Sequence, residues 1–587
     1  MNTAEPRKIR NYFRHYRYAF SGGILFLILT QAFALSVPQF LRIGTDALVA
    51  NESDQVRFAA FGLMGAALGG ALCRVLSRIL IFNSGRKVEC DLRDDLYAYL
   101  IGLSASFFQK MPTGQIMSRA VNDLTQVRLL LGPGLLNVTN TLLIYTVVIP
   151  LLLWSDFELA ALALLSLPLL LLSGRWMGRR IYELSRLTQD RLGKLSDRVQ
   201  ENLGGVSTIR SYQREQFEIE RFDEKNEEYF QANVHLAKIR GVLFPVMGLF
   251  GSFGSVILLY LGGQRVISGQ MTVGEFVEFG AYLNILIWPT IALGWMIALW
   301  QRGMAAMERI NEIFTTSPDM IDGGHHDAIL EEAPIFELKS LSFSYPNQEH
   351  DALRNINVQV REGEFVVVVG RTGSGKSTLV KLITRLLPVD DDKLFLRGVD
   401  YNQYDIDTVR GQFAYAPQEA FLFSRTIRDN IRFSQHEALD EDVDSTVIRA
   451  GLHQDLTAFS DGLDTLVGER GVTLSGGQRQ RTTLARALMN QAPILVLDDT
   501  LSAVDNETES AILDGIRSTK NQTTILVTHR LAAASLADRI LVLENGELVE
   551  QGTERELLEQ SGVYAQLYEH QRRREQLEGS GVAGESQ

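Results

Sequence analysis

Six long apolar stretches occupy the first 330 of this chain's 587 residues, and each approaches the ~20 residues that a helix needs to cross a bilayer. They predict an all-α transmembrane domain. The first stretch is long, and no small-residue cleavage site follows a short apolar region, so we expect a membrane span there rather than a cleaved signal peptide. The predicted spans are residues 20–41, 58–81, 131–154, 159–177, 242–266 and 273–299.

Basic residues cluster immediately before the first span, in the segment PRKIRNYFRHYRY. Lysine and arginine accumulate on the cytoplasmic side of membrane helices, so this pattern places the N-terminus in the cytoplasm. The segment also predicts an elbow helix over residues 1–18 that lies in the membrane interface, with a simple basic leader as the alternative. The next connection, at residues 51–55, is short and acidic, as expected of an outer loop.

The spacing between the spans is uneven. Roughly 50 to 60 residues separate spans two and three, and also spans four and five, whereas the other connections are short. Both long segments are charged and rich in helix-forming residues, and alternation from the N-terminus places them in the cytoplasm. They predict long amphipathic helices that continue from the membrane.

A glycine-rich motif, GRTGSGKST, predicts a nucleotide-phosphate site. It matches G-x-x-x-x-G-K-[ST], in which backbone N–H groups surround the phosphates, Lys376 reaches the β- and γ-phosphates and Ser377 faces Mg²⁺. Alone, the motif indicates only that a nucleotide binds. The residues of the predicted loop are Gly370, Arg371, Thr372, Gly373, Ser374, Gly375, Lys376, Ser377 and Thr378.

Three further motifs follow in order along the chain. LSGGQ occupies residues 474–478, where glycines and a serine at a helix start suit the close approach of an anion. ILVLDD predicts a buried parallel strand that delivers the carboxylates of Asp498 and Asp499 to a site at its end. TTILVTHR repeats this pattern and ends near His529.

This ordered set resembles the nucleotide-binding domain of ATP-binding cassette (ABC) proteins, and with the six spans it resembles the half-transporter of the type IV ABC exporter family. The resemblance implies an α/β P-loop domain after the all-α transmembrane domain, with ATP and Mg²⁺ as cofactors. It also implies hairpin tips that dock on the cassettes, here near residues 112–120 and 211–222, with plain connecting helices as the alternative. The expected domains are an elbow helix at 1–18, a transmembrane domain with two coupling hairpins at 19–315, a linker at 316–333, the nucleotide-binding domain at 334–571 and a disordered tail at 572–587.

The resemblance further implies roles for individual residues of the cassette. Tyr345 matches the aromatic residue that stacks on adenine, and Asp498 matches the aspartate that holds the metal through water. His529 matches the switch histidine on the γ-phosphate. Residues 467–471 match the segment that senses the hairpins, and 502–505 match the loop that crosses the dimer interface. Catalytic roles fall to Asp499, His529 and Gln418, and metal contacts to Ser377, Gln418 and Asp498.

The LSGGQ motif implies a dimer. In the family it closes over ATP held by the opposite cassette, so one chain cannot form a complete site. We therefore expect dimerisation with another ABC half-transporter. The residues that would contact the partner's nucleotide are Ser475, Gly476, Gly477 and Gln478.

Asp499 departs from the family pattern, which has glutamate at this position. The shorter side chain withdraws the carboxylate by about 1 Å, and such a displacement can cost ~10²-fold in rate. The chain looks most like one half of the bacterial heterodimeric multidrug-resistance-like exporters, namely the half with the altered carboxylate, whose partner carries the glutamate. The alternatives are a homodimeric lipid or drug flippase with slow ATPase activity, and an ATP-gated channel or regulator.

The composition of the chain limits the classes of molecule that it is expected to bind. Residues 331–587 hold 41 acidic and 26 basic side chains, so this half lacks the basic excess of a nucleic-acid-binding domain, and we expect no nucleic acid partner. The spans imply contact with membrane lipids. The family implies the bacterial inner membrane, a cytoplasmic cassette, and an amphipathic drug, lipid or peptide as substrate.

Charged residues near the spans say little about that substrate. Arg74 and Arg78 lie one helical turn apart at the cytoplasmic end of span two, which favours an interfacial position over an anion site. Glu275 and Glu278, near the outer end of span six, fit a cationic substrate or a neighbouring helix equally well.

Overall fold

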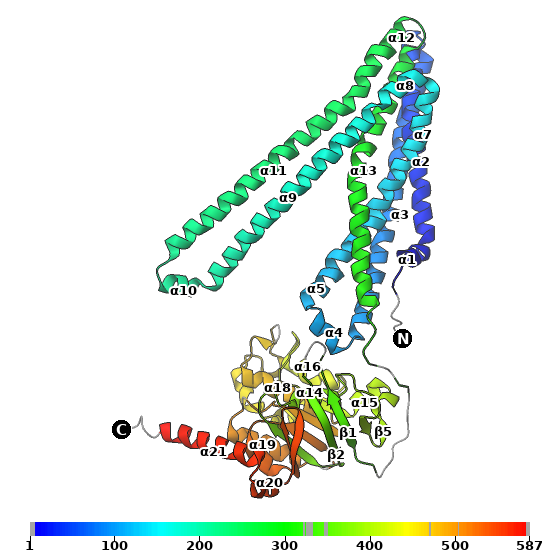
Figure 1. The fold of residues 1–587 in the computed structure, drawn as a ribbon. Helices are drawn as coiled ribbons and strands as arrows, with labels where there is room; N and C mark the ends of the chain where they lie inside the picture. The colour runs from blue at the N-terminus through cyan, green and yellow to red at the C-terminus, as the bar shows by residue number, and fades with distance from the viewer. Residues whose placement is uncertain are drawn as a thin grey trace. The chain divides into compact units, whose positions relative to one another are not determined.

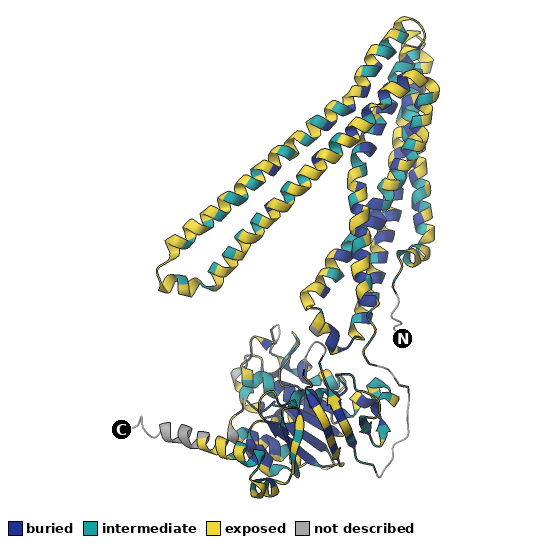
Figure 2. Cartoon of the chain, viewed as in Figure 1, coloured by how far each residue is buried: buried dark blue, intermediate teal, exposed yellow. Residues whose placement is uncertain are grey.

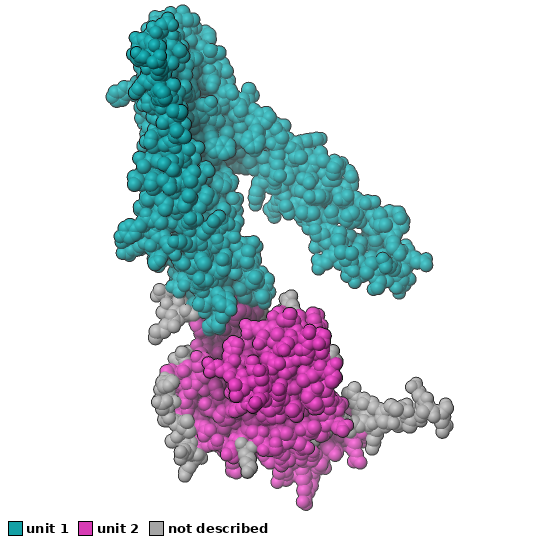
Figure 3. Space-filling view, turned by 180° about the vertical axis from the view of Figure 1, so that it is seen from behind, with its two compact units in different colours: residues 1–102, 111–317 teal, residues 103–110, 318–587 magenta. Residues whose placement is uncertain are grey.

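The computed structural model describes residues 6–320, 323–324, 333–345, 350–468, 471–502, 504–519 and 521–582. The chain divides into two compact units (Figure 3). The first contains residues 1–102 and 111–317, and the second contains residues 103–110 and 318–587. Two of the predicted loops, 467–471 and 502–505, include residues outside the described part of the chain.

The first unit contains six helical segments that are long and apolar enough to cross a membrane, and each predicted span lies within one of them. These segments run from Arg17–Val49, Ser53–Ile101, Thr113–Ser155, Phe157–Gly204, Glu215–Ile267 and Val273–Phe314. The helices exceed the spans because charged, helix-forming sequence continues them beyond the apolar part. The protein is therefore a multi-pass membrane protein with an all-α membrane domain.

The helices of this unit follow one another with short breaks (Figure 1). In chain order they are α1 (Ile9–His15), α2 (Arg17–Val49), α3 (Ser53–Ile101), α5 (Thr113–Ser118), η1 (Arg119–Asp123), α6 (Leu124–Leu129), η2 (Leu130–Gly134), α7 (Leu135–Ser155), α8 (Phe157–Leu164), α9 (Ser166–Gly204), α10 (Val206–Ser211), α11 (Glu215–Ile257), η3 (Leu258–Gly262), α12 (Gly263–Ile267) and α13 (Val273–Phe314).

Helices α2 and α3 pack closely because glycines on α3 leave room for aromatic rings of α2. A Cβ atom on Gly62 would lie 2.4 Å from the ring of Phe40, and one on Gly69 would lie 2.8 Å from the ring of Phe33. Helices α9 and α11 instead pack on each other and diverge from the rest of the bundle (Figure 1). Buried residues accordingly concentrate among the other helices, while the far half of the α9–α11 hairpin is largely exposed (Figure 2).

Ion pairs join both ends of α13 to neighbouring helices. At its N-terminal end, Arg42 of α2 lies 2.8 Å from Glu275 and 3.3 Å from Glu278. Of the two alternatives for these glutamates, pairing with a neighbouring helix is therefore the one that the structure supports. At the other end, Arg309 donates two hydrogen bonds, of 2.9 and 2.5 Å, to the buried carboxylate of Asp123 in η1.

The turn of the first long hairpin belongs to the second unit. It contains α4 (Ala105–Lys110), which lies earlier than the predicted tip at 112–120. The hydroxyl of Ser104 donates to the carboxylate of Asp319 at 2.8 Å, and Ser106 donates to the same carboxylate. The turn of the second hairpin is formed by α10, near the predicted tip at 211–222.

The second unit has two sheets. One is antiparallel with strand order β2-β1-β4-β5, and the other has six strands in the order β10-β9-β3-β8-β7-β6, parallel except for β10. The strands are β1 (Phe336–Phe343), β2 (Leu353–Val360), β3 (Phe365–Gly370), β4 (Leu394–Leu396), β5 (Val399–Asp400), β6 (Phe413–Ala416), β7 (Ile494–Asp498), β8 (Thr523–Val527), β9 (Arg539–Glu544) and β10 (Glu547–Gly552).

Helices cover the six-stranded sheet, so its central strands are buried on both faces. Val367 and Leu497 pack in the core on one face, and Val366 and Val496 in the core on the other. After α4, the helices in the described part of the second unit are, in chain order, α14 (Lys376–Ile383), η4 (Tyr401–Gln403), α15 (Ile406–Gly411), α16 (Ile427–Ile431), η5 (Arg432–Ser434), α17 (Asp440–Arg449), η6 (His453–Ala458), η7 (Gly462–Asp464), α18 (Gly476–Met489), α19 (Asn506–Arg517), η9 (Leu531–Leu536), α20 (Glu554–Gln560) and α21 (Val563–Val582).

The C-terminal helix α21 continues beyond the expected boundary at residue 571. Residues 572–582, which we expected to be disordered, are helical, and residues 583–587 lie outside the described part of the chain. The sequence RRREQLE consists of good helix formers, so it prolongs a helix that has already begun at Val563.

Candidate nucleotide-binding site

The predicted phosphate loop connects the end of β3 to the start of α14. Gly375 precedes the helix with a φ of 98°, a left-handed backbone that side chains rarely adopt. A Cβ atom at this position would lie 2.6 Å from the carbonyl oxygen of Ala352, so both the backbone angle and the space require glycine. The loop therefore ends at a helix N-terminus, where backbone N–H groups and the helix dipole attract anions.

Lys376 folds back over this loop. Its ammonium group donates to the carbonyl oxygens of Gly370 at 2.8 Å and Arg371 at 2.9 Å. Burial lowers the pKa of Lys376, while the nearby charges of Asp499 and Asp498 act in the opposite direction. The described residues provide carbonyl and hydroxyl partners but no ion pair for this ammonium group. It is therefore free to donate to a phosphate oxygen, which would be its counterion.

Asp498 ends the buried strand β7 beside the loop. Its carboxylate accepts a hydrogen bond of 3.2 Å from the hydroxyl of Ser377. Burial raises the pKa of Asp498, and the adjacent Asp499 raises it further, while Ser377 opposes both effects. A hydroxyl and a carboxylate in contact provide two hard oxygen atoms of the kind that Mg²⁺ prefers.

Asp499 contacts two residues for which the sequence predicts catalytic roles. Its carboxylate lies 2.9 Å from Nδ1 of His529, and Gln418 also hydrogen bonds to it. Burial raises the pKa of Asp499, and His529 is the largest opposing influence. The backbone of Asp499 has a φ of 51°, which aspartate tolerates better than most residues, and its N–H donates to the carbonyl oxygen of Val527 at 2.9 Å.

These groups line one open cleft with a volume of about 1600 Å³. The cleft includes Tyr345, whose hydroxyl lies 3.3 Å from the hydroxyl of Thr378. Every predicted site residue outside LSGGQ lies at this cleft: Tyr345, Gly370, Arg371, Thr372, Gly373, Ser374, Gly375, Lys376, Ser377, Thr378, Gln418, Asp498, Asp499 and His529.

The LSGGQ residues lie elsewhere in the same unit. Ser475 caps the N-terminus of α18, and its hydroxyl and the side chain of Gln478 form a reciprocal capping box. Ser475, Gly476, Gly477 and Gln478 do not line the cleft. The helix N-terminus that they form has backbone N–H groups suited to an anion, and it is separate from the phosphate loop.

The cleft also has a wall that sequence reasoning missed. Helix α21 contributes residues between Gln566 and Arg573, including His570. The side chain of Gln571 accepts a hydrogen bond of 3.0 Å from the backbone N–H of Leu531, close to His529. The helical pattern of this segment predicts a helix, but nothing in its composition indicates a nucleotide site.

The residues present fit a bound Mg²⁺ ion together with a nucleotide. Within the described residues there is no cluster of three or more His, Cys, Asp or Glu side chains that could hold a metal ion by themselves. Mg²⁺ in nucleotide sites characteristically uses one or two carboxylates and completes its shell with phosphate oxygens and water. Ser377, Asp498 and Gln418 match that requirement.

Comparison with known proteins agrees with both units. The family described as "ABC transporter transmembrane region" matches residues 20–290, and the family described as "ABC transporter" matches residues 353–502. A solved structure of a bacterial Atm1-family ABC exporter with ATP bound is similar over 94% of this chain and 98% of that chain, with a TM-score of 0.77 and 26% identity.

Three curated relatives are similar over most of their length. The probable multidrug resistance ABC transporter ATP-binding/permease protein YheI of Bacillus subtilis is 35% identical over 577 residues, covering 96% of this chain and 97% of the relative. The multidrug resistance-like ATP-binding protein MdlA of Escherichia coli is 31% identical over 566 residues, with 95% of each covered. The ATP-dependent lipid A-core flippase of Photobacterium profundum is 33% identical, with 88% of each covered.

Proposed function

This chain belongs to the ABC transporter family as an exporter with fused transmembrane and ATP-binding domains, and on that premise we propose that it couples ATP hydrolysis to the outward transport of amphipathic compounds. The proposed substrates are drugs, lipids or peptides. The proposed location is the bacterial inner membrane, with the N-terminus and the ATP-binding domain in the cytoplasm. The basic segment before α2 supports this orientation.

The proposal for the ATP site rests on the separation of the phosphate loop from the helix N-terminus at Ser475. Lys376 and the phosphate loop line the cleft, whereas Ser475 and its helix N-terminus do not. A site that uses both elements needs a second cassette, and ABC exporters work as dimers. We propose that Ser475 contacts ATP held by the partner and that Lys376 contacts ATP held by this chain.

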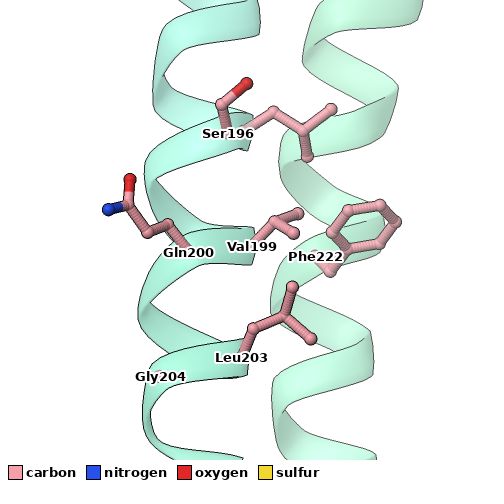
Figure 4. Close-up of a pocket in the computed structure, with 7 residues that line it drawn as sticks. Ser196, Val199, Gln200, Leu203, Gly204 and Phe222 are labelled. Carbon is pink, nitrogen blue, oxygen red and sulfur yellow. The ribbon is translucent and has the colours of Figure 1, made fainter. Parts of the chain in front are cut away.

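An apolar groove on the α9–α11 hairpin supports the presence of a partner chain. It has a volume of about 640 Å³, and Val199 and Leu203 of α9 face Phe222 of α11 across it (Figure 4). Apolar residues exposed together on a cytoplasmic helix pair, as proposed for this hairpin, are costly in water and are typical of contact surfaces. The residues lining the groove are Leu195, Ser196, Val199, Gln200, Leu203, Gly204 and Phe222.

The residues of the cleft that the sequence motifs single out have proposed tasks during hydrolysis. Lys376 and the backbone N–H groups of the loop bind the phosphates, and Tyr345 packs on the adenine. Ser377, Asp498 and Gln418 would hold Mg²⁺, which when bound neutralises charge that develops on the phosphate oxygens. Asp499 accepts a proton from the attacking water, and His529 fixes the orientation of the Asp499 carboxylate through the 2.9 Å contact.

We further propose that this chain forms a heterodimer in which its own site is the weaker one. The support is Asp499, because a carboxylate drawn back by about 1 Å is poorly placed for the attacking water. The intact LSGGQ motif of this chain would then complete the stronger site, on a partner with glutamate at the corresponding position. A homodimer with uniformly slow hydrolysis is the second candidate, and the similarity to a lipid A-core flippase supports lipid as its substrate.

Transport by inside-out membrane vesicles tests the proposed function. Vesicles that contain this chain and a second half-transporter should take up an amphipathic dye when ATP and Mg²⁺ are supplied, and Lys376→Met together with the equivalent change in the partner should abolish uptake. Conductance across a planar bilayer without vectorial uptake would instead support an ATP-gated channel.

A further inference from the structure

Arg530, the residue after His529, is held in a network that was not anticipated from the sequence. Its guanidinium donates to the carbonyl oxygens of Ser502 and Val504, each at 2.8 Å. It also lies 2.5 Å from the carboxylate of Glu509 on α19, whose side chain is only 4% exposed. One side chain thus joins the backbone beside His529 to two points of the 502–505 loop.

The same loop is connected to Asp499 and to the LSGGQ helix. The hydroxyl of Ser502 donates to the carbonyl oxygen of Asp499 at 3.0 Å, and it accepts a hydrogen bond of 3.1 Å from the side chain of Gln480 on α18. Asp499 in turn contacts His529. The contacts therefore form a closed circuit from Ser502 through Asp499 and His529 to Arg530 and back to Ser502, and Gln480 connects this circuit to the LSGGQ helix.

The buried carboxylate of Glu509 needs the positive charge of Arg530 beside it. Its other carboxylate oxygen, Oε1, is buried and has no hydrogen-bond partner among the described residues. An ionised carboxylate in that environment needs its single arginine partner, because a buried unpaired charge is strongly unfavourable. Arg530 is consequently fixed at one end by Glu509, and its remaining N–H groups hold the loop carbonyls with little freedom.

We propose that Arg530 is a positioning residue that couples the orientation of His529 to the 502–505 loop. This inference rests on the proposed function, in which that loop crosses to the partner cassette and LSGGQ serves the partner's ATP. A shift of the loop on formation of the dimer then moves Arg530 and, through the shared backbone, His529. The state of one ATP site thereby affects the geometry of the other without a direct contact between the two nucleotides.

The test uses the full-length chain in nanodiscs with its partner half-transporter, in which the catalytic glutamate is replaced so that the measured kcat belongs to this chain's own site. Arg530→Met should lower the kcat for ATP by ~10²-fold, the cost of a misplacement on the order of 1 Å, with little change in KM. Arg530→Lys, which retains the charge opposite Glu509 but not the forked geometry, should give an intermediate kcat. Arg539→Met is the matched control. Arg539 is equally exposed, at 25%, and pairs with Glu364 at 2.8 Å at the opposite end of the sheet.

A double-mutant cycle separates positioning from stability. His529→Ala should lower kcat strongly in the wild-type background and add little in the Arg530→Met background, because both changes remove the same geometry. In the Arg539→Met background its effect should be undiminished. Additive effects of His529→Ala and Arg530→Met, or a kcat for Arg530→Met no lower than for Arg539→Met at equal loss of Tm, would overturn the inference. Absence of ATPase activity in the wild-type pair would instead refute the proposed function.

Discussion

The carboxylate of Asp499 lies 2.9 Å from Nδ1 of His529, so the aspartate at the position where the family resemblance implies glutamate directly contacts the proposed switch histidine. The carboxylate of Asp499 therefore has its hydrogen-bond partners within its own cassette. His529 and Gln418 hold this carboxylate in one orientation, and the shorter side chain keeps it about 1 Å short of the position that a glutamate would reach.

The first prediction concerns this side chain. Asp499→Glu should raise ATP turnover at this chain's own site by up to ~10²-fold, because the added methylene advances the carboxylate by about 1 Å. Steady-state phosphate release by the chain alone and with its partner measures the effect. In the pair, Asp499→Asn should matter much less than loss of the partner's catalytic glutamate. A lone chain that turns over ATP as fast as the pair would contradict the heterodimer.

The phosphate loop and the helix N-terminus at Ser475 should affect different nucleotides. Lys376→Met should weaken nucleotide binding at this chain's own site, because it removes the ammonium group above the phosphate loop. Ser475→Arg should abolish hydrolysis at the partner's site, because a bulky cation replaces the cap of α18. Nucleotide trapping with the two chains labelled separately distinguishes the two effects. Full steady-state turnover with Ser475→Arg would show that LSGGQ does not act across the interface.

Stability should depend on pH through Asp499. Burial raises the pKa of this carboxyl, so the folded protein binds the proton more tightly than the unfolded chain. The carboxyl therefore favours folding in acid and opposes it as the pH rises through the raised pKa. Asp499→Asn should raise the Tm of the nucleotide-free protein at neutral pH, and by less in mildly acidic solution.

Asp505 serves as a control because its pKa is shifted in the opposite direction from that of Asp499. It caps α19, and hydrogen bonding from Thr508 lowers its pKa. Its stabilising effect is present above the unfolded pKa and is lost as the pH falls through the folded pKa. Asp505→Asn should therefore lower the Tm at neutral pH, and thermal unfolding at several pH values compares both variants. A Tm gain for Asp499→Asn that is the same at every pH would exclude titration of Asp499 as its source.

The bidentate pair of Arg309 with Asp123 should stabilise the C-terminal end of α13. Arg309→Met leaves a buried carboxylate without its partner, and the expected cost is about 1–3 kcal/mol, since Arg309 is itself half exposed. Thermal unfolding in nanodiscs measures the loss. Arg57→Met is the control, because its pair with Asp54 is exposed on both sides and should contribute almost nothing. Equal Tm values for the two variants would show that the Asp123 pair does not stabilise the fold.

Binding of ATP and Mg²⁺ should move the outer ends of the membrane helices apart in the dimer. Spin labels at Val49 and Ile267, which are 66% and 89% exposed, can report the change without disturbing packing. Gly274 is unsuitable for a label, because a Cβ atom there would lie 2.5 Å from Arg42 and Asp46. Label distances that do not change on nucleotide addition, with a partner unable to hydrolyse ATP, would contradict alternating access.

The six membrane helices and the cassette could be predicted from the sequence because each has a strong local pattern. A run of ~20 apolar residues or a phosphate loop needs no knowledge of its neighbours. The circuit around Arg530 could not be predicted, because Ser502, Glu509 and Arg530 meet only through the packing of the sheet and α19. The approach of α21 to the cleft also depends on tertiary packing, since its own sequence contains only helix-forming and charged residues.

Residues 103–110 fold with a unit whose remaining sequence is synthesised much later. Ser104 and its acceptor Asp319 are 215 residues apart in the chain. At ribosomal rates of ~5–20 residues per second, about 10–40 s pass before the acceptor exists. During this interval helix α4 lacks its eventual packing surface, and the nascent chain offers it to proteases and chaperones. Completion of the second unit therefore depends on residues 318–587, so a slow codon or a pause after the sixth span should lengthen the exposure of a helix made long before.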